Sequence, residues 1–291
     1  MTDQTFTLDS EVDGLPLTGY VWKAQPADTA RGLVVVAHGM AEHAKRYVTF
    51  ARSLNEAGYM VVAHDHRGHG ASPGPNGLGD FGKAGWDALV KDLAQVVRFA
   101  KSQFSGLDTV LFGHSMGSFA TQQFLLSDGE LLDRVVLSGS AATDKLFAAL
   151  AKARSESSDS GLNIHNRGFT HRTGYEWLSR DEEQVDRYVS DPLCGFELTT
   201  ESIMGLIAQA ATLADLNNLK NIPTNLPVLL LAGSDDPVTG QLAFLETLYK
   251  RYKQVGISQV DTLYYQGGRH EMLNEINRQQ VVADVIAWLD S

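Results

Sequence analysis

The chain has 291 residues, and its 35 acidic residues against 24 basic ones give a formal net charge of −11. A nucleic-acid-binding surface needs clustered Lys and Arg, and anionic membranes attract cations. This charge therefore argues against nucleic acid as a partner and against charge-driven docking on an anionic membrane. A single cysteine, Cys194, excludes an internal disulfide and a zinc site built on two or more cysteines of one chain.

The N-terminal residues show no basic segment followed by an apolar run, which is the pattern of a secretory signal. The chain also lacks the stretch of about 18 apolar residues that a transmembrane helix needs. From these features we expect a soluble, cytoplasmic protein without stable membrane insertion. Nothing in the sequence bears on its oligomeric state.

Short apolar runs alternate with longer amphipathic segments along most of the chain. The runs predict strands at 33–37, 60–63, 109–112, 134–137, 228–231 and 259–265. The amphipathic segments predict helices at 46–57, 85–104, 116–126, 241–252 and 278–289. Near-continuous apolar strands between helices are typical of a parallel sheet covered on both faces, so we predict an α/β fold. Such sheets bind their ligands at the carboxyl ends of the strands.

One interval, residues 142–221, breaks this alternation because it contains no good strand pattern. Helices are predicted at 144–154 and 200–217, with a polar, glycine-containing stretch between them. An insertion of this length is too long for a simple connection. We therefore divide the chain into a core, 1–141 with 222–291, and a helical insertion, 142–221. The insertion is either a decoration that covers the sheet or a lid that shapes a substrate pocket.

The segment Gly113-His114-Ser115-Met116-Gly117 matches the pattern G-x-S-x-G. It follows a predicted strand directly and opens a predicted helix, which is the strand–turn–helix setting that a nucleophile elbow requires. The turn holds its serine above the sheet, and the helix that follows directs its positive end to the same place. Ser115 is therefore the candidate nucleophile.

A serine hydroxyl needs a base, and that base needs an acid to orient it. His270 is the best-placed histidine, because it lies in the glycine-rich loop after the predicted strand 259–265. The acid should follow the preceding strand, where either Asp235 or Asp236 could serve. We favour Asp236, because Asp235 can be a turn or cap residue before Pro237. The order Ser, Asp, His is that of the α/β-hydrolases.

The tetrahedral intermediate of acyl transfer needs hydrogen-bond donors for its oxyanion. One donor is the backbone N–H of Met116, the residue after the nucleophile. The second should come from the loop after the strand 33–37, and the backbone N–H of Met40 is the candidate there.

Taken together, these motifs resemble the serine hydrolases of the α/β-hydrolase superfamily, and more narrowly the monoacylglycerol lipase and lysophospholipase branch. The resemblance rests on H-G-M-A-E-H at 38–43 with Arg46-Tyr47, D-H-R-G-H-G-A-S at 65–72, the elbow at 113–117, G-S-D-D at 233–236, and His270. It implies an eight-stranded sheet with a helical cap inserted after the sixth strand. It also implies Asp236 as the catalytic acid and a serine esterase that needs no metal or organic cofactor.

The resemblance further implies a small-molecule ester substrate, such as a monoacylglycerol, a lysophospholipid or a similar single-acyl ester. Ile203, Leu206 and Ile207 recur at helical spacing in the insertion and could line an acyl pocket, although they could equally pack the insertion on the sheet. A carboxylesterase for small soluble esters therefore stays open as an alternative, and the acidic charge mildly favours soluble or neutral substrates.

Other classes are weaker alternatives. The segment His64-Asp65-His66-Arg67-Gly68-His69 resembles a metal-ligand motif, but Gly68 stands where that motif has an aspartate. A non-catalytic ligand-binding module is possible on the same fold. A serine nucleophile excludes the dehalogenase and epoxide hydrolase relatives that use Asp at that position, whereas peroxidase-like and aminopeptidase-like relatives remain compatible.

Overall fold

The computed structural model describes residues 4–156 and 161–291. Eight strands form one sheet in the order β1-β2-β4-β3-β5-β6-β7-β8. Their bounds are Gln4–Asp9 (β1), Pro16–Trp22 (β2), Gly32–Ala37 (β3), Tyr59–His64 (β4), Thr109–His114 (β5), Arg134–Ser138 (β6), Val228–Gly233 (β7) and Val260–Tyr265 (β8). From β4 through β8 all neighbours pair in parallel, which confirms the predicted α/β fold.

The first two strands were not predicted from their residue pattern. β1 and β2 pair antiparallel with each other, and β2 pairs antiparallel with β4. β1 is an edge strand with much of its surface in solvent, so it carries a weaker apolar signal than the buried strands. Its place in the sheet depends on pairing with β2, which a local pattern cannot reveal.

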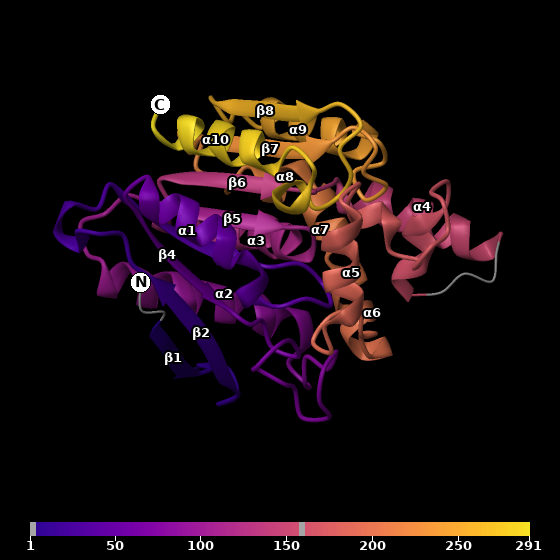
Figure 1. The fold of residues 1–291 in the computed structure, drawn as a ribbon, viewed down its shortest axis with the longest axis horizontal. Helices are drawn as coiled ribbons and strands as arrows, with labels where there is room; N and C mark the ends of the chain where they lie inside the picture. The colour runs from indigo at the N-terminus through magenta and orange to yellow at the C-terminus, as the bar shows by residue number, and fades with distance from the viewer. Residues whose placement is uncertain (1–3, 157–160) are drawn as a thin grey trace.

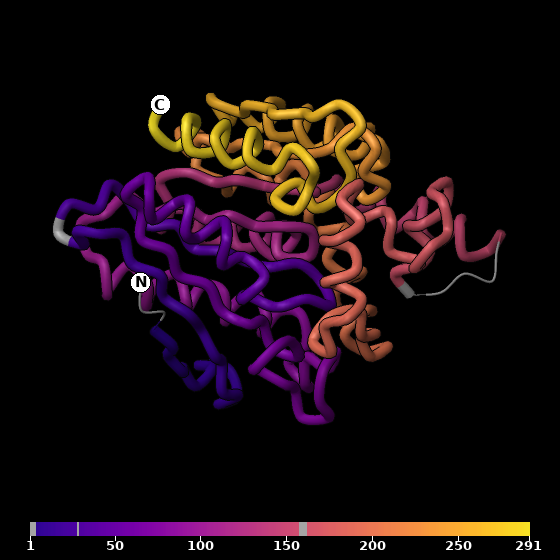
Figure 2. The backbone as a smooth tube through the Cα atoms, viewed as in Figure 1, coloured from indigo at the N-terminus to yellow at the C-terminus, as the bar shows by residue number. Residues whose placement is uncertain are grey.

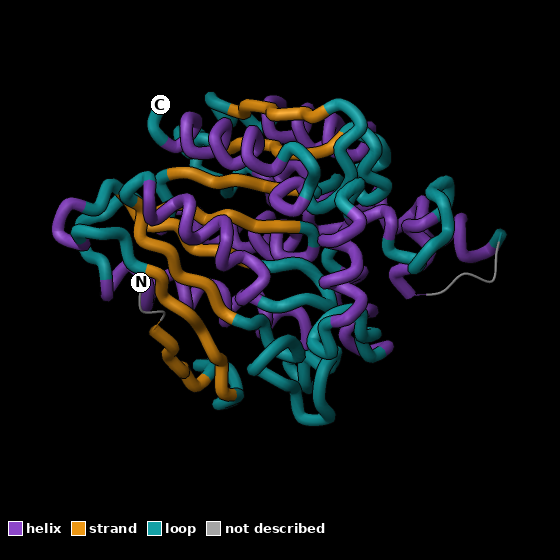
Figure 3. Tube along the Cα trace, viewed as in Figure 1, coloured by secondary structure: helices purple, strands orange, loops and turns teal. Residues whose placement is uncertain are grey.

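Helices cover both faces of the sheet (Figures 1 and 3). The helices α1 (Val48–Glu56) and α10 (Arg278–Leu289) pack on one face. The other face is covered by α2 (Gly85–Gln103), α3 (Met116–Asp128) and α9 (Ala243–Gln254). Within β3, Val34 and Val36 contribute to the first core and Leu33 and Val35 to the second, as the alternation of a strand requires. The sheet is therefore buried on both sides.

Two predicted helix boundaries differ from the structure. The segment predicted as a helix over 46–57 begins as a 3₁₀ turn, Ala44–Tyr47, and only then continues as α1. The helix predicted from Gln241 begins at Ala243, because Gln241 and Leu242 have φ angles of 53° and 75°. A right-handed helix cannot include residues with positive φ.

Between β6 and β7 the described residues form helices and no strand. These helices are α4 (Thr143–Ser155), α5 (Glu182–Ser190), α6 (Thr200–Ala208), α7 (Ala210–Ala214) and α8 (Leu216–Leu219). Figures 1 and 2 show this segment beyond the carboxyl ends of the parallel strands. Part of the polar stretch predicted here, residues 157–160, lies outside the described residues.

The single helix predicted over 200–217 is wrong, and α5 was missed. Gln209 separates α6 from α7, and Asp215 stops α7 and caps α8 by accepting a hydrogen bond from the amide of Asn217. An aspartate whose side chain binds a following amide favours a new helix start over a helix interior. Asp181 caps α5 in the same way, through the amides of Glu183 and Gln184.

No helix in the described part of the chain is both long and apolar enough to cross a membrane.

Candidate active site

Ser115 lies in the sharp turn between β5 and α3, with a φ of 51° and a ψ of −121°. This conformation is strained for a residue with a side chain. The flanking glycines allow it, because a Cβ atom on Gly113 would lie 2.5 Å from Oγ1 of Thr121. A Cβ atom on Gly117 would lie 2.2 Å from the carbonyl oxygen of Ala37. The elbow therefore packs against α3 only with glycine at position 113, and α3 approaches the end of β3 only with glycine at position 117.

Asp236 and His270 come from the loops after β7 and β8 and meet at the same edge of the sheet. Nδ1 of His270 lies 2.9 Å from Oδ2 and 3.0 Å from Oδ1 of Asp236. Asp236 is fully buried, and its Oδ1 also accepts a hydrogen bond from the amide of Val238. Asp235 is exposed, and its carboxylate accepts a hydrogen bond from Ser234. Of the two candidate acids, the geometry therefore favours Asp236.

Burial of His270 opposes a positive charge on its imidazole. The carboxylate of Asp236 outweighs this effect, so the pKa of His270 lies above its usual value. The neighbouring His114 lies with its ring centroid 4.7 Å from that of His270. Burial, followed by the proximity of His270, lowers the pKa of His114 to about 4, so His114 is neutral near pH 7.

Ser115 and His270 line the same cavity, which has a volume of about 60 Å³. Nε2 of His270, the nitrogen available to a nucleophile, is buried and forms no hydrogen bond with any described residue. His270 is thus hydrogen-bonded to Asp236 in this structure, but among the described residues its Nε2 is not hydrogen-bonded to Ser115. Catalytic hydrogen bonds are often long before substrate binds.

Met40 and Met116, whose amides are predicted to hold the oxyanion, both line this cavity. Among the described residues, none accepts a hydrogen bond from either amide. The preceding amide, that of Gly39, donates to Oε1 of Glu42 over 2.5 Å. Glu42 therefore fixes the loop that carries Met40, while the amide of Met40 stays available.

A buried charge network lies beside the cavity, and the sequence analysis did not identify it. Arg46 donates to both oxygens of Glu271, over 2.6 and 2.7 Å, and to Oε2 of Glu42 over 2.5 Å. Its guanidinium also lies 4.9 Å from the ring centroid of Tyr188 in α5. Burial alone would raise the pKa of Glu42, but Arg46 reverses this effect and the pKa falls to about 2. The spacing of Glu42 and Arg46, four residues apart, was the available signal.

A second cavity of about 610 Å³ adjoins the first. Both are bordered by Met40, Phe147, Leu150, Leu162, His165 and Leu206. Ile203 and Ile207 line the larger cavity, and Leu206 lines both. The three residues predicted for an acyl pocket therefore line the serine cavity or the larger cavity that shares a wall with it.

Comparison with known proteins agrees with this geometry. Residues 28–277 match the family described as Serine aminopeptidase, S33. The chain belongs to this family of α/β-hydrolases. It is 29% identical to a monoacylglycerol lipase of Mycolicibacterium smegmatis, over 96% of this chain and 95% of that protein. It is 30% identical to mouse monoglyceride lipase, over 95% of this chain and 88% of that protein.

Solved structures show the same relationship for this S33-family hydrolase. A thermostable carboxyl esterase from Bacillus coagulans superposes with a TM-score of 0.85 at 25% identity, over 100% of this chain and 98% of that one. The predicted membership of the α/β-hydrolase superfamily, in its monoacylglycerol lipase and lysophospholipase branch, is thereby confirmed.

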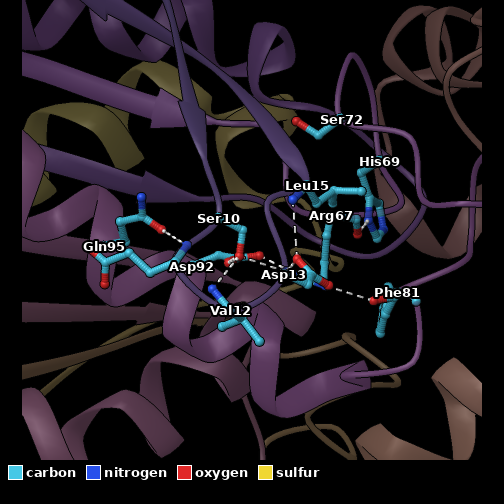
Figure 4. Close-up of polar contacts among 12 residues, drawn as sticks. Ser10, Val12, Asp13, Leu15, Arg67, His69, Ser72, Phe81, Asp92 and Gln95 are labelled. Carbon is cyan, nitrogen blue, oxygen red and sulfur yellow. Dashed lines mark hydrogen bonds and ion pairs between the residues drawn. The ribbon is translucent and has the colours of Figure 1, made fainter.

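Within the 64–69 segment, Arg67 forms a network of hydrogen bonds that joins three parts of the hydrolase. Arg67 is fully buried and donates to Asp92 over 2.7 Å, to Asp13 over 2.9 Å and to the carbonyl oxygen of Phe81 over 3.0 Å (Figure 4). It also donates to the hydroxyl of Ser10. These contacts tie the turn between β1 and β2 to α2 and to the loop after β4.

The alternative metal site in this segment lacks converging ligands. Among the described residues, the one group of three whose ligand atoms lie within 4.8 Å of one another is His43, Asp191 and Cys194. There, Nε2 of His43 is hydrogen-bonded to Asp191 over 2.9 Å. Burial raises the pKa of the Cys194 thiol well above its usual value, which disfavours the thiolate that would bind a metal.

Proposed function

We propose that this S33-family hydrolase is a serine carboxylic ester hydrolase with Ser115, Asp236 and His270 as its catalytic triad, acting on monoacylglycerols and similar single-acyl esters. The observation that carries the proposal is the pairing of Nδ1 of His270 with buried Asp236, in a cavity shared with the strained Ser115.

In the proposed mechanism, Ser115 attacks the ester carbonyl while Nε2 of His270 accepts its proton. Asp236 orients the imidazole and stabilises the imidazolium. The amides of Met40 and Met116 hold the oxyanion. His270 then gives its proton to the leaving alcohol. Finally His270 activates a water molecule, which releases the acid from the acyl-enzyme.

The larger cavity supports a substrate with an acyl chain. Its wall is largely apolar, and it shares Met40 and Leu206 with the wall of the serine cavity. Removing a hydrocarbon chain from water into such a cavity is favourable, by about 0.8 kcal/mol per CH₂ group. Two relatives, from M. smegmatis and mouse, carry the names monoacylglycerol lipase and monoglyceride lipase.

Peptide hydrolysis is the competing activity suggested by the family's description. An aminopeptidase must bind the ammonium group of its substrate, which needs an unpaired anionic partner when buried. The carboxylates bordering the serine cavity, Glu42 and Glu271, are already paired with Arg46. This pairing favours an uncharged ester substrate.

We also propose that residues 142–221 form a cap domain on a core of residues 1–141 and 222–291. Helices α4 and α6 supply walls of both cavities, so the cap defines the substrate pocket as well as covering the sheet. A cytoplasmic location stays a prediction of the sequence.

The test is labelling by a fluorophosphonate probe, followed by intact mass and peptide mapping, on wild type and Ser115→Ala. One adduct at Ser115, with no adduct and no ester hydrolysis in the folded variant, is the expected result. Wild-type turnover by Ser115→Ala would refute the proposal. Hydrolysis of an aminoacyl amide faster than any monoacyl ester would favour the peptidase instead.

A further inference from the structure

The serine elbow contains a second buried hydroxyl, that of Ser118, to which the proposed mechanism gives no task. Ser118 lies in the first turn of α3, and its hydroxyl donates to the carbonyl oxygen of Ser115 over 2.6 Å. The same carbonyl oxygen accepts from the amides of Ser118 and Phe119, over 2.8 and 3.2 Å. The two amides belong to the helix backbone and do not depend on the side chain, whereas the third bond is supplied by the serine hydroxyl alone.

The carbonyl group of Ser115 and the amide of Met116 belong to one peptide group. Because a peptide group is planar, a contact that holds its carbonyl oxygen also sets the direction of its N–H. A hydrogen bond to the carbonyl oxygen also polarises the peptide, which strengthens its N–H as a donor. The hydroxyl of Ser118 therefore acts on the same peptide that offers its N–H to the oxyanion in the proposed mechanism.

Two further side chains extend this hydrogen bond into a chain that leads away from the site. The hydroxyl oxygens of Ser118 and Ser140 lie 2.8 Å apart. Nε2 of Gln122 donates to Oγ of Ser140 over 2.9 Å and to the carbonyl oxygen of Ala141 over 3.0 Å. The side chains of Ser118, Ser140 and Gln122 are all buried, so bulk water does not compete for these bonds.

The hydrogens of this chain can point in one direction only. A backbone carbonyl accepts and cannot donate, so Ser118 gives its single hydroxyl hydrogen to Ser115. The hydrogen between the two serine hydroxyls then comes from Ser140, whose oxygen accepts from Gln122. The amide of Gln122 cannot be reversed, because its Oε1 would then face the carbonyl oxygen of Ala141. The chain therefore starts at Gln122 and ends at the carbonyl oxygen of Ser115.

We propose that Ser118, with Ser140 and Gln122 behind it, positions and polarises the peptide that carries the oxyanion donor of Met116. Every bond in the chain donates toward the site, so successive bonds strengthen one another. Ser118 is a positioning residue, because it acts through the peptide and touches no reacting atom. This inference rests on the proposed ester hydrolase function.

The test uses a ligand that forms an oxyanion in the site. Oγ of Ser115 adds to the carbonyl carbon of 1,1,1-trifluoro-2-octanone, its proton passes to Nε2 of His270, and the carbonyl oxygen becomes the oxyanion. The matched ligand 2-octanone has the same carbon chain but is a poor electrophile, so it binds without the covalent bond. The ratio of the two inhibition constants measures the stabilisation of the adduct. This ratio is internal to the active enzyme, so a loss of folded protein does not change it.

In Ser118→Ala, the trifluoromethyl ketone should bind about three- to tenfold more weakly relative to 2-octanone, the value of one hydrogen bond. The loss should stay below the roughly 10²–10³ caused by removing a whole oxyanion donor, because the N–H of Met116 remains. For p-nitrophenyl butyrate, kcat should fall by a similar factor while KM changes less than about twofold. Acylation and deacylation both pass through an oxyanion, so both steps slow together.

Thr121→Val is the matched control. Oγ1 of Thr121 is equally buried in the same helix and donates to the carbonyl oxygen of Gly117 over 2.8 Å. The peptide that it contacts carries the amide of Ser118, which is one hydrogen bond removed from the oxyanion donor. The ratio of inhibition constants should therefore change less than about twofold. Urea denaturation should nevertheless show a loss of stability like that of Ser118→Ala, because each variant loses one buried hydrogen bond.

An unchanged ratio in Ser118→Ala would overturn the proposal. Equal changes in Ser118→Ala and Thr121→Val would overturn it as well, because they would indicate a structural role alone. If Ser118→Ala does not fold, Ser118→Cys carries the same test, because a thiol fills the site but is a weak donor. A failure of the underlying function would look different. In that case wild type would bind the two ketones equally, and Ser115 would take no fluorophosphonate label.

Discussion

Arg46 donates two parallel hydrogen bonds to Glu271, the residue that follows His270, although 225 positions separate the two in the chain. The same guanidinium binds Glu42, which holds the amide of Gly39 in the oxyanion loop. One buried cation thus joins the loop of the predicted oxyanion donor to the loop of the predicted base. The side chains of Arg46 and Glu271 are only 12% and 6% exposed, so solvent screens this pair little.

Removing the cation should therefore weaken both stability and catalysis. Arg46→Met leaves the buried carboxylates of Glu42 and Glu271 without the cation that pairs with both, and we expect a loss of about 3–5 kcal/mol in the free energy of unfolding. The rate constant kcat should fall about tenfold or more, because the loop of Met40 and the loop of His270 lose the side chain that holds both in place. Urea denaturation and steady-state kinetics measure the two effects.

The control is the double variant Arg46→Met with Glu271→Gln, which relieves one of the unpaired charges. If the pair is coupled, the double variant is more stable than the sum of the single effects predicts. Strict additivity would contradict the coupling between the two loops.

Two adjacent aspartates provide a matched test of the triad. Asp236→Asn should lower kcat by roughly 10³–10⁴, because the amide cannot stabilise the imidazolium or hold the right tautomer. Asp235→Asn should stay within about twofold of wild type, since its exposed carboxylate makes no contact with His270. A large loss in Asp235→Asn and a small one in Asp236→Asn would reverse the assignment.

The same pair of variants predicts a change in the pH profile. His270 must be neutral to accept the serine proton, and Asp236 holds its pKa above the usual value against the effect of burial. Activity should therefore fall as the pH drops through this raised pKa. In Asp236→Asn burial loses its main opponent and only the smaller effects of Glu271 and Glu42 still raise the pKa of His270, so the acid limb of residual kcat/KM should move to lower pH. In Asp235→Asn the limb should not move, and a shift there would count against the assignment.

The cap helix α6 should control acyl chain length. Ile207→Trp places a larger side chain in the 610 Å³ cavity, and kcat/KM for long-chain esters should fall roughly tenfold or more relative to short-chain esters. Met204→Trp is the matched control, because Met204 lies on the same helix but is 60% exposed. A series of p-nitrophenyl esters measures the profile. An Ile207→Trp profile identical to that of wild type would remove α6 from the acyl site.

Buried histidines should make the protein sensitive to acid. His38, His64, His66 and His69 lie together, and burial lowers the pKa of each, to about 3 for His64 and for His69. Unfolding releases these side chains to a pKa near 6.5, so the unfolded state binds more protons below that pH. Their contribution to stability is full above pH 6.5 and is lost progressively as the pH falls towards 3.

His64→Leu isolates one of these histidines. Neither ring nitrogen of His64 has a hydrogen-bond partner in the described part of the chain, so an apolar side chain of similar size leaves no other described group unsatisfied. We compare the free energy of unfolding of the variant with that of wild type at each pH. This difference should favour the variant by about 2 kcal/mol more at pH 5 than at pH 8. Denaturant titrations at the two pH values give this difference, and an equal effect at both would show that His64 is not held neutral by burial.

The sequence by itself determined the residue types of the site and the parallel core. Strand patterns and the elbow glycines are local signals, because burial on both faces demands continuous apolar runs and a tight turn demands glycine. Ser115, His270 and the candidate pair Asp235 and Asp236 follow from their positions after predicted strands. The expected chain order then completes the triad.

The tertiary structure brings Asp236, the aspartate that the sequence favoured, into contact with His270, and only the tertiary structure decided which other residues stand beside that histidine. Those contacts join side chains from different loops, and distance in space between such loops is set by packing of the whole sheet. The pairing of Arg46 with Glu271 and the place of His165 next to Trp177 are of this kind. Neither leaves a periodic trace in the sequence, so no local pattern could have predicted it.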